Sequence, residues 1–258
     1  MRDQLSLRLE PETATLPNLP EGLRPMRPKP LPEPFDSEAH VFEPWWGGLR
    51  ALAYVGPASV PGAGDVRVVD EVGRDVGARL PELAGMAVRL DARSAVVDGE
   101  LVAVDDEGRA DNAELERRIA GETGRAVAFL AFDLLHLDGR SLLTMPLTRR
   151  RDLLKRILRP GDEVVAVPAI AGEGKALHSA AAAQGIAGIL ARQRTSPYLP
   201  GVTSRLWRYV PVAPLGSTGR KAAAAAGPDA AAAGPDEAAT AAAPVIALIR
   251  RLPLLFDE

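Results

Sequence analysis

The stretch FEPWWGGLRALAYV, residues 42–55, has the pattern of a tight Gly-Gly turn that leads into a strand. Enzymes place nucleophiles at such sharp turns. Here the turn carries Trp45 and Trp46, and an indole nitrogen can donate a hydrogen bond but cannot attack a substrate. The stretch therefore predicts that the two tryptophans pack against the protein, with stacking of Trp45 on a base or another ligand as the alternative.

Other residue types that carry chemistry are scarce. Cysteine is absent, which excludes disulfides, thiol catalysis and cysteine-based zinc sites and is typical of a cytoplasmic protein. The three histidines lie far apart in the sequence and lack the spacing of metal ligands: His40, His136 and His178. Among 31 basic residues, lysine occurs only at Lys29, Lys155, Lys175 and Lys221. A lysine nucleophile therefore has few possible positions.

Hydrophobic periodicity predicts a domain of mixed strands and helices. We expect strands at 49–55, 126–139, 163–168, 185–192 and 204–210, and helices at 75–86, 111–120, 148–158 and 174–185. Residues 94–109 indicate two strands joined by a hairpin at Asp98-Gly99, followed by a second turn at 105–108. The arginine run 149–151 has the pattern of a solvated helix start, with a phosphate-contacting patch as the alternative.

Composition divides the chain into four parts. Residues 1–33 are a proline-rich lead-in, and residues 34–211 carry the folded pattern. Residues 212–244 are a low-complexity linker of Ala, Gly and Pro, and residues 245–258 are a short apolar segment. We expect no second globular domain.

Bulk charge and hydropathy limit the partners. The net charge is −3 and the pI about 5.8, so the composition as a whole lacks the basic surplus of proteins that hold DNA by its phosphates. No apolar run reaches the length of a membrane span, and the N-terminus lacks the apolar core of a signal peptide.

The order of several phrases resembles the nucleotidyltransferase (adenylation) domain of bacterial ATP-dependent DNA ligases, over residues 32–211. The phrases are FEPWWGGLRALAYV, VDGELVAVDDEGR, AFDLLHLDGR, GIAGILARQRTSPYLPG and SRLWRYV. The resemblance implies an α+β fold of antiparallel sheets flanked by helices, similar to ATP-grasp folds. It also implies ATP and Mg²⁺ as cofactors, DNA as a substrate, and a lysine that attacks ATP and carries AMP to a nick.

The positions that would handle phosphate and metal are altered. In the family pattern E-x-K-x-D-G-x-R, Trp45 stands at the nucleophilic lysine and Gly47 at the aspartate. The family's S-R-x-G is Asp70-Glu71-Val72-Gly73, which places an acid where the family has arginine. In E-G-x-V-x-K, Ala187 replaces the carboxylate that would help to place a metal, and Arg192 replaces the lysine. The final W-x-K-x-K is WRYVP at 207–211, with both lysines absent and Arg208 on the opposite face of the strand.

Residues of the base and ribose pocket persist. The resemblance places Glu43 at the adenine-recognising position, Arg50 near the ribose and phosphate, Glu100 where it contacts ribose or metal, and Phe132 under the adenine ring. Each has a simpler interpretation: Phe132 as a core residue, Glu100 as a surface strand residue, and Gly47-Gly48 as a sharp bend.

We therefore expect a member of the ATP-dependent DNA ligase family that does not adenylylate itself and holds no metal. The expected role is a binding or scaffold domain in DNA repair, with weak DNA binding and a protein partner. Two alternatives stay open: an active ligase or nucleotidyltransferase with a rearranged site, and a sensor that binds nucleotide non-covalently. The family normally carries an OB-type barrel after this domain, but residues 212–258 are too few and too rich in alanine for one.

Overall fold

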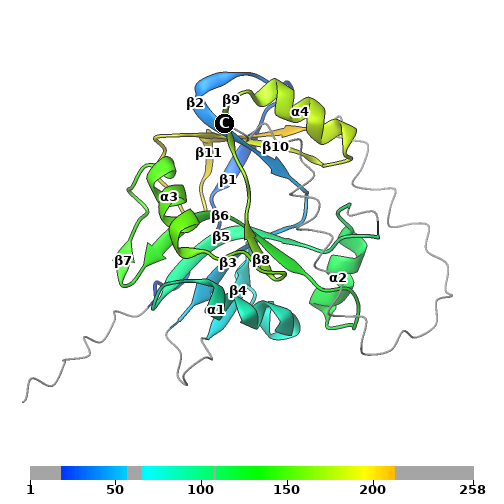
Figure 1. The fold of residues 1–258 in the computed structure, drawn as a ribbon, viewed down its shortest axis with the longest axis vertical. Coiled ribbons are helices and arrows are strands. Elements are labelled where there is room, and N and C mark those ends of the chain that lie inside the picture. The colour runs from blue at the N-terminus through cyan, green and yellow to red at the C-terminus, as the bar shows by residue number, and fades with distance from the viewer. Residues whose placement is uncertain (1–18, 57–64, 107–108, 213–258) are drawn as a thin grey trace, which may run out of the picture.

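The computed structural model describes residues 19–56, 65–106 and 109–212 as two sheets that face each other, with helices packed around them (Figure 1). Sheet A has the strand order β1-β11-β10-β2-β9: Arg27–Pro30, Thr203–Pro211, Gly188–Gln193, Ser37–Trp45 and Ile170–Gly172. Sheet B has the order β4-β3-β5-β6-β7, with β8 beside β6: Val66–Asp70, Leu49–Val55, Ala95–Val102, Ala128–Leu137, Arg140–Ser141 and Val164–Ala166. The turn at Gly47-Gly48 connects the two sheets.

Most neighbouring strands run antiparallel, as the α+β class predicts. The parallel pairs are β1 with β11 and β6 with β8. The expected strands at 49–55 and 204–210 are confirmed as β3 and β11, and the long apolar run at 126–139 is confirmed as β6. The α+β fold class is therefore confirmed.

Three of the four expected helices are confirmed: α2 (Asn112–Ala120), α3 (Leu147–Ile157) and α4 (Gly174–Ala183). Asp111 caps α2 by accepting a hydrogen bond from the Glu114 backbone N–H at 3.0 Å. The helix expected at 75–86 is instead two short 3₁₀ turns, Gly77–Arg79 and Pro81–Gly85, followed by α1 (Met86–Arg89). Pro81 causes the break, because it disfavours a helical conformation at the preceding Leu80.

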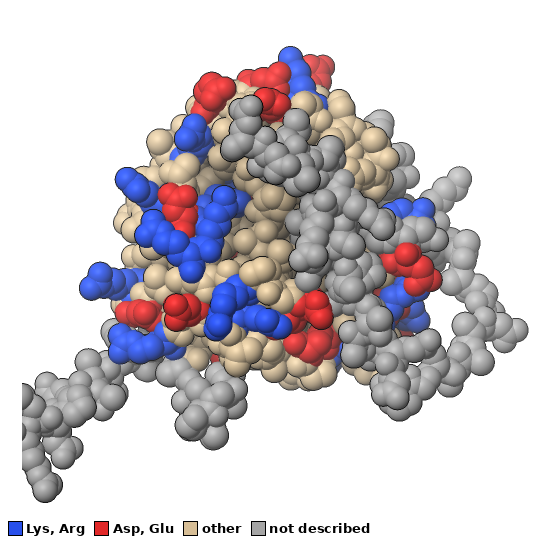
Figure 2. Space-filling model, viewed as in Figure 1, with Lys and Arg blue, Asp and Glu red and all other residues tan. Residues whose placement is uncertain are grey.

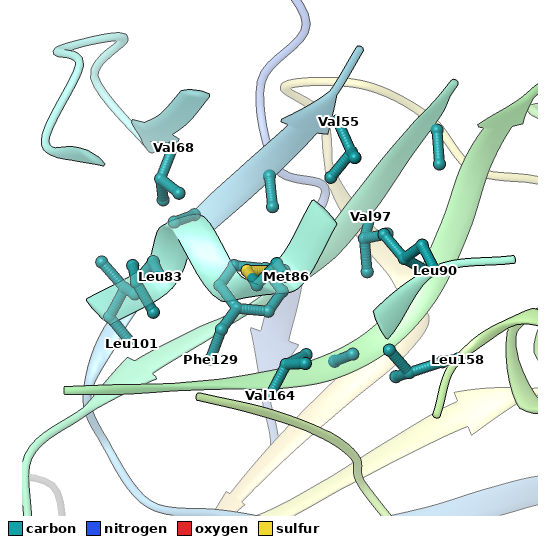
Figure 3. Close-up of a cluster of buried hydrophobic side chains, with 14 of the residues drawn as sticks. Val55, Val68, Leu83, Met86, Leu90, Val97, Leu101, Phe129, Leu158 and Val164 are labelled. Carbon is teal, nitrogen blue, oxygen red and sulfur yellow. The ribbon is translucent and has the colours of Figure 1, made fainter. Parts of the chain in front are cut away.

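The main hydrophobic core lies on the side of sheet B that faces away from sheet A. Figure 3 shows part of this cluster, with Leu83 near Leu101 and Met86 near the Phe129 ring. A second cluster reaches from the space between the sheets to α4, and a third lies between the sheets around Trp207 and Tyr198. Hydrophobic side chains therefore pack against both faces of each sheet.

The predicted hairpin at Asp98-Gly99 is wrong. Strand β5 continues through both residues, and β3 and β6 flank it. Gly99 is needed because a Cβ there would overlap the Phe129 ring and the Leu130 carbonyl oxygen. Asp98 is fully buried and pairs with Arg50. The Asp-Gly pair therefore serves two purposes other than a turn: Gly99 allows β6 to approach closely, and Asp98 forms a buried ion pair.

The proline-rich lead-in contributes to the folded unit. Its residues Arg27–Pro30 form β1 beside β11, and Met26 is fully buried. The division at residue 34 stays a prediction. The predicted linker and apolar C-terminal segment, like the start of the lead-in, lie outside the described residues.

Candidate functional site

Backbone geometry fixes the turn between β2 and β3. Gly47 has φ +80°, a left-handed conformation that side chains other than glycine adopt only with strain. A Cβ on Gly48 would overlap the Leu101 carbonyl oxygen on β5. Both glycines are therefore required where the chain passes from one sheet to the other.

The altered family positions contact one another. The Trp45 ring meets the Tyr209 ring edge to face, with 4.0 Å between the ring centroids. The Tyr209 hydroxyl donates to the Ala187 carbonyl oxygen at 3.2 Å. A Cβ on Gly47 would lie 3.1 Å from the Ala187 Cβ, so this alanine adjoins the turn. The positions that the resemblance assigns to the nucleophile, a carboxylate and a phosphate-facing lysine thus form one small packed group.

Trp46 is almost fully buried and packs with the second hydrophobic cluster. Neither indole N–H finds a hydrogen-bond acceptor among the described residues. This geometry agrees with the packing interpretation of the tryptophans, and stacking of Trp45 on a ligand stays a prediction.

Glu100 lies beneath the turn and is fully buried, not at the surface as its simpler interpretation expected. Its Oε1 accepts a hydrogen bond from the Gly48 backbone N–H. Burial raises the pKa of Glu100 to about 7, although the N–H groups of the turn and the Arg50 guanidinium oppose the shift. The carboxyl group therefore supports the turn from below and titrates near neutral pH.

Glu43, on β2, is fully buried between two guanidiniums. Arg151 of α3 and Arg192 of β10 each form an ion pair with its carboxylate. Both arginines also donate to the Phe132 carbonyl oxygen, at 2.9 and 3.0 Å. The carboxylate that the resemblance assigns to adenine recognition is thus engaged by the protein itself.

Phe132 is also fully buried. The guanidiniums of Arg50 and Arg192 each lie 5.5 Å from its ring centroid. Arg50 donates to both carboxylate oxygens of Asp98 at 2.6 Å and to the Gly99 carbonyl oxygen at 3.1 Å. Phe132 therefore lies against arginines of its own chain, and Arg50 is committed to an aspartate on the neighbouring strand.

A further ion pair completes a buried charge network between the sheets. Arg150 of α3 donates hydrogen bonds to both carboxylate oxygens of Asp133, at 2.9 and 2.7 Å, and the Arg192 guanidinium lies 3.7 Å from the same carboxylate. Burial lowers the pKa of Arg192 to about 10, so this guanidinium stays charged at neutral pH. The network contains the guanidiniums and carboxylates of these residues: Arg50, Arg150, Arg151, Arg192, Glu43, Asp98 and Asp133.

The interpretation of residues 149–151 as a solvated helix start is wrong for two of them. Arg149 is exposed, whereas Arg150 and Arg151 point into the protein. Lys and Arg side chains gather over α3 in Figure 2, where Arg149, Lys155 and Arg156 are exposed. The sequence does contain a signal that Arg150 and Arg151 are buried. Together with Leu147 and Leu154 they occupy positions i, i+3, i+4 and i+7, which lie on one face of a helix.

Two further segments that the resemblance assigns to the family motifs lie at the end of β4 and in β11. Asp70 is buried and closes its own turn, accepting from the N–H groups of Val72 and Arg74 at 3.0 and 2.8 Å. Trp207 points between the sheets with its ring 4.8 Å from the Arg192 guanidinium. Arg208 lies on the opposite face of β11, as its position in the strand predicts.

The donor set does not suit a divalent cation. Glu100 is bound to the turn, Glu43 is held between two arginines, and Ala187 offers no carboxylate. In the part of the chain that the structure describes, no group of three or more His, Asp or Glu side chains is placed to share a metal. The side chains that would meet a nucleotide base, Glu43 and Phe132, are likewise enclosed. The residues present therefore do not fit ATP with Mg²⁺ in this arrangement.

Residues 35–209 match the family described as the ATP dependent DNA ligase domain. Because the match covers most of the chain, this chain belongs to the ATP-dependent DNA ligase family. The expected resemblance is confirmed, and the fold is that of the family's adenylation domain.

Similar proteins include end-joining proteins and probable DNA ligases. The chain is 34% identical over 167 residues to the multifunctional non-homologous end joining protein LigD of Mycobacterium bovis, covering 65% of this chain and 21% of that protein. It is 32% identical over 194 residues to a probable DNA ligase of Rhodococcus opacus, covering 72% of this chain and 38% of that protein. The chain thus spans about a fifth to two fifths of the length of these relatives.

Among solved structures, a mycobacterial DNA ligase D complexed with ATP and MES is similar, with TM-score 0.62 and 30% identity. The match covers 73% of this chain and 60% of that one. None of the helices in the described ranges has the length and apolarity needed to cross a bilayer.

Proposed function

We propose that this chain is a catalytically silent member of the ligase family that acts as a binding or scaffold domain in DNA repair. It shares the fold of enzymes that join DNA but does not form the lysine–AMP intermediate. Relatives named as end-joining proteins and DNA ligases support the link to repair.

The observation that carries this proposal is Trp45, at the position of the nucleophilic lysine. It packs against Tyr209, and no described lysine is placed to substitute for it. Lys29, Lys155 and Lys175 are all exposed, on β1, α3 and α4. Lys175 also lies 3.8 Å from the Asp36 carboxylate on the outer surface.

The charge balance between the sheets supports the same proposal. Phosphoryl transfer depends on cations that neutralise the triphosphate. The four arginines between the sheets are already paired with three carboxylates of the chain: Arg50 with Asp98, Arg150 with Asp133, and both Arg151 and Arg192 with Glu43. A triphosphate entering this space would have to displace these pairs, which costs free energy because each displaced carboxylate would be buried without its partner.

The test is incubation of the purified chain with α-labelled ATP and either Mg²⁺ or Mn²⁺, followed by denaturing electrophoresis. Trp45→Lys restores the family's amine at its position. Trp46→Lys is the matched control, because it adds the same charge one residue away. Circular dichroism establishes that each variant is folded. We expect no covalent label on the wild type or on either variant, because more than the lysine is altered.

The other outcomes separate the alternatives. Label on the wild type would overturn the proposal and favour an active enzyme with a rearranged site, and peptide mapping would then locate the nucleophile. Label on Trp45→Lys alone would show that the pocket still admits ATP. An ATP-dependent rise in the melting temperature of the unlabelled wild type would favour the nucleotide sensor.

The binding half of the proposal is tested with DNA. We expect the chain to bind a nicked duplex weakly, with an affinity that falls steeply as salt increases, because phosphate contacts release counterions. Affinity for DNA that does not depend on salt, or no affinity at the lowest salt, would leave a protein partner as the scaffold's target.

A further inference from the structure

A hollow of about 360 Å³ opens on the outer face of sheet A, which is the face that carries α4. Its walls come from segments far apart in the sequence: Leu31, Phe35, His40, Gln193, Arg205 and Arg208. None of these residues belongs to the network between the sheets. Small-molecule sites have volumes of about 300–1,000 Å³, so this hollow is large enough for a small ligand.

An irregularity of β11 brings the two arginines to one side. Strand β1 pairs Pro28 with Ser204, but its next residue, Lys29, pairs with Arg208. Residues 205–207 are therefore extra on the β11 side of this ladder. Such a bulge re-aims side chains, which explains how two arginines three residues apart along one strand line the same hollow.

Both arginines are available to a ligand. Arg205 is exposed and Arg208 is partly exposed. Neither forms an ion pair with a carboxylate within the described ranges, in contrast to the arginines between the sheets. Two guanidiniums without carboxylate partners at one hollow favour an anion, and their planar donors match the oxygens of a phosphate.

The remaining walls suit a flat ring. The rings of Phe35 and His40 lie edge to face with 5.2 Å between centroids, and Phe35 is anchored in the same way on Phe42 at 5.4 Å. Burial, with the neighbouring Arg208, lowers the pKa of His40, so its ring is neutral at pH 7. Gln193 adds an amide that can both donate to and accept from the edge of a base. Aromatic rings and an amide beside a cationic pair are the elements used to hold a nucleotide.

We propose that this hollow binds a phosphate-bearing nucleotide unit, with Arg205 and Arg208 on the phosphate and Phe35 and His40 against the base. The unit is either a free mononucleotide or the 5′-phosphorylated end of a DNA strand. The site is separate from the positions that the family uses for ATP, because those lie between the sheets. The proposal does not depend on whether the chain adenylylates itself.

The test is fluorescence anisotropy with a short single-stranded DNA that carries a 3′-fluorophore, with and without a 5′-phosphate, at constant salt. We expect the phosphorylated probe to bind about tenfold more tightly, and the variant Arg205→Ala/Arg208→Ala to lose that preference. The matched control is Arg93→Ala/Arg140→Ala, which removes the same charge from exposed positions near one turn of sheet B. This control should keep the preference.

Competition with AMP distinguishes a free mononucleotide from a strand end as the ligand, and a Phe35 variant tests the contact with the base. Competition by AMP indicates that a mononucleotide suffices, whereas failure of AMP with retained binding of the phosphorylated probe indicates a strand end. Phe35→Leu keeps an apolar anchor on Phe42 but removes the aromatic face, so it should weaken probe binding about tenfold.

Several results would overturn the proposal. They are equal binding of the two probes, equal losses in the arginine variant and its control, and no binding of either probe or AMP. Phenyl phosphate or inorganic phosphate that competes as well as AMP would overturn the assignment of the ring walls to a base. A covalent label from ATP on the wild type would overturn the proposed silence of the ligase site but would leave this site untouched.

Discussion

The Trp45 and Tyr209 rings meet edge to face with 4.0 Å between their centroids, at the positions that the family resemblance assigns to the nucleophilic lysine and to a phosphate-facing lysine. Aromatic pairs in this geometry stabilise the fold beyond the area that they bury. Their contact spans β2 and β11, which both flank β10 in sheet A.

Trp45 should therefore contribute to stability. Trp45→Ala is expected to lower the free energy of unfolding by about 2 kcal/mol, because the ring is partly buried and its contact with Tyr209 is lost. Trp45→Phe should cost less than about 1 kcal/mol, because the indole N–H has no acceptor to lose. Urea unfolding measures both, with Val72→Ala at an exposed site as the control. Equal losses for Ala and Phe would contradict a packing role.

Glu100 should make stability depend on pH. Its pKa rises from an ordinary value of 4.5 to about 7 in the folded state, so the folded chain binds this proton more tightly than the unfolded chain. The stability contributed by Glu100 is therefore highest at low pH, falls as the pH rises from 4.5 to about 7, and is constant above that.

The variant Glu100→Gln isolates this effect, because the amide cannot titrate but can still accept from Gly48. Relative to the wild type, it should gain about 2 kcal/mol of stability between about pH 5 and about pH 8. Chemical unfolding of both proteins across this range gives the difference. A difference that stays the same at every pH would show that Glu100 has an ordinary pKa.

Substitution of the two glycines of the turn should cost different amounts of stability. Gly48→Ala is expected to destabilise by about 3 kcal/mol or more, because the new Cβ would overlap the Leu101 carbonyl oxygen, which belongs to rigid backbone. Gly47→Ala should cost about 1–2 kcal/mol, mainly from its positive φ. Thermal melts of the two variants, beside Gly22→Ala at an open position with φ +69°, would rank them. A smaller loss at Gly48 than at Gly47 would mean that the turn can shift away from β5.

Glu43 and Arg192 should be strongly coupled. Arg192→Met leaves a buried carboxylate with one partner fewer and should cost about 3–5 kcal/mol. The double variant Glu43→Gln/Arg192→Met removes the uncompensated charge, so its loss should be at least about 1 kcal/mol smaller than the sum of the single losses. A double-mutant cycle in urea measures this term. Additive losses would argue that Arg151 alone neutralises Glu43.

Much of the fold follows from local pattern. The apolar run of β6 and the capped start of α2 at Asp111 are readable from residue types alone. Strand β1 is not readable, because a proline-rich segment ordinarily forms no ladder. It pairs at the edge of sheet A, where β11 is its neighbour among the strands of the described residues. The Asp98-Gly99 pair predicts a turn wrongly, because Asp-Gly is a common turn sequence but here lies within β5, at an irregularity of its pairing with β6.

Some residues of the candidate site could likewise be predicted from the sequence, and others could not. Phrase order located Glu43, Arg50, Glu100 and Phe132, and the structure brings these residues to the facing sides of the sheets around the turn. Their partners were missed, because Arg151 and Arg192 meet Glu43 only through contacts between segments more than a hundred residues apart. Charge runs near a helix start are usually solvated, so only the stripe shared with Leu147 and Leu154 marked Arg150 and Arg151 as inward-facing.

The buried charge network has a consequence for how the chain comes apart. Sheet A contributes Glu43 and Arg192, sheet B contributes Arg50, Asp98 and Asp133, and α3 contributes the remaining arginines. Two of these pairs cross the gap, Arg192 of sheet A with Asp133 of sheet B and Arg151 of α3 with Glu43 of sheet A, so separating the sheets would break both of them. The molecule should then behave as one cooperative unit, with amide protons of β5, β6 and β10 exchanging through the same global opening.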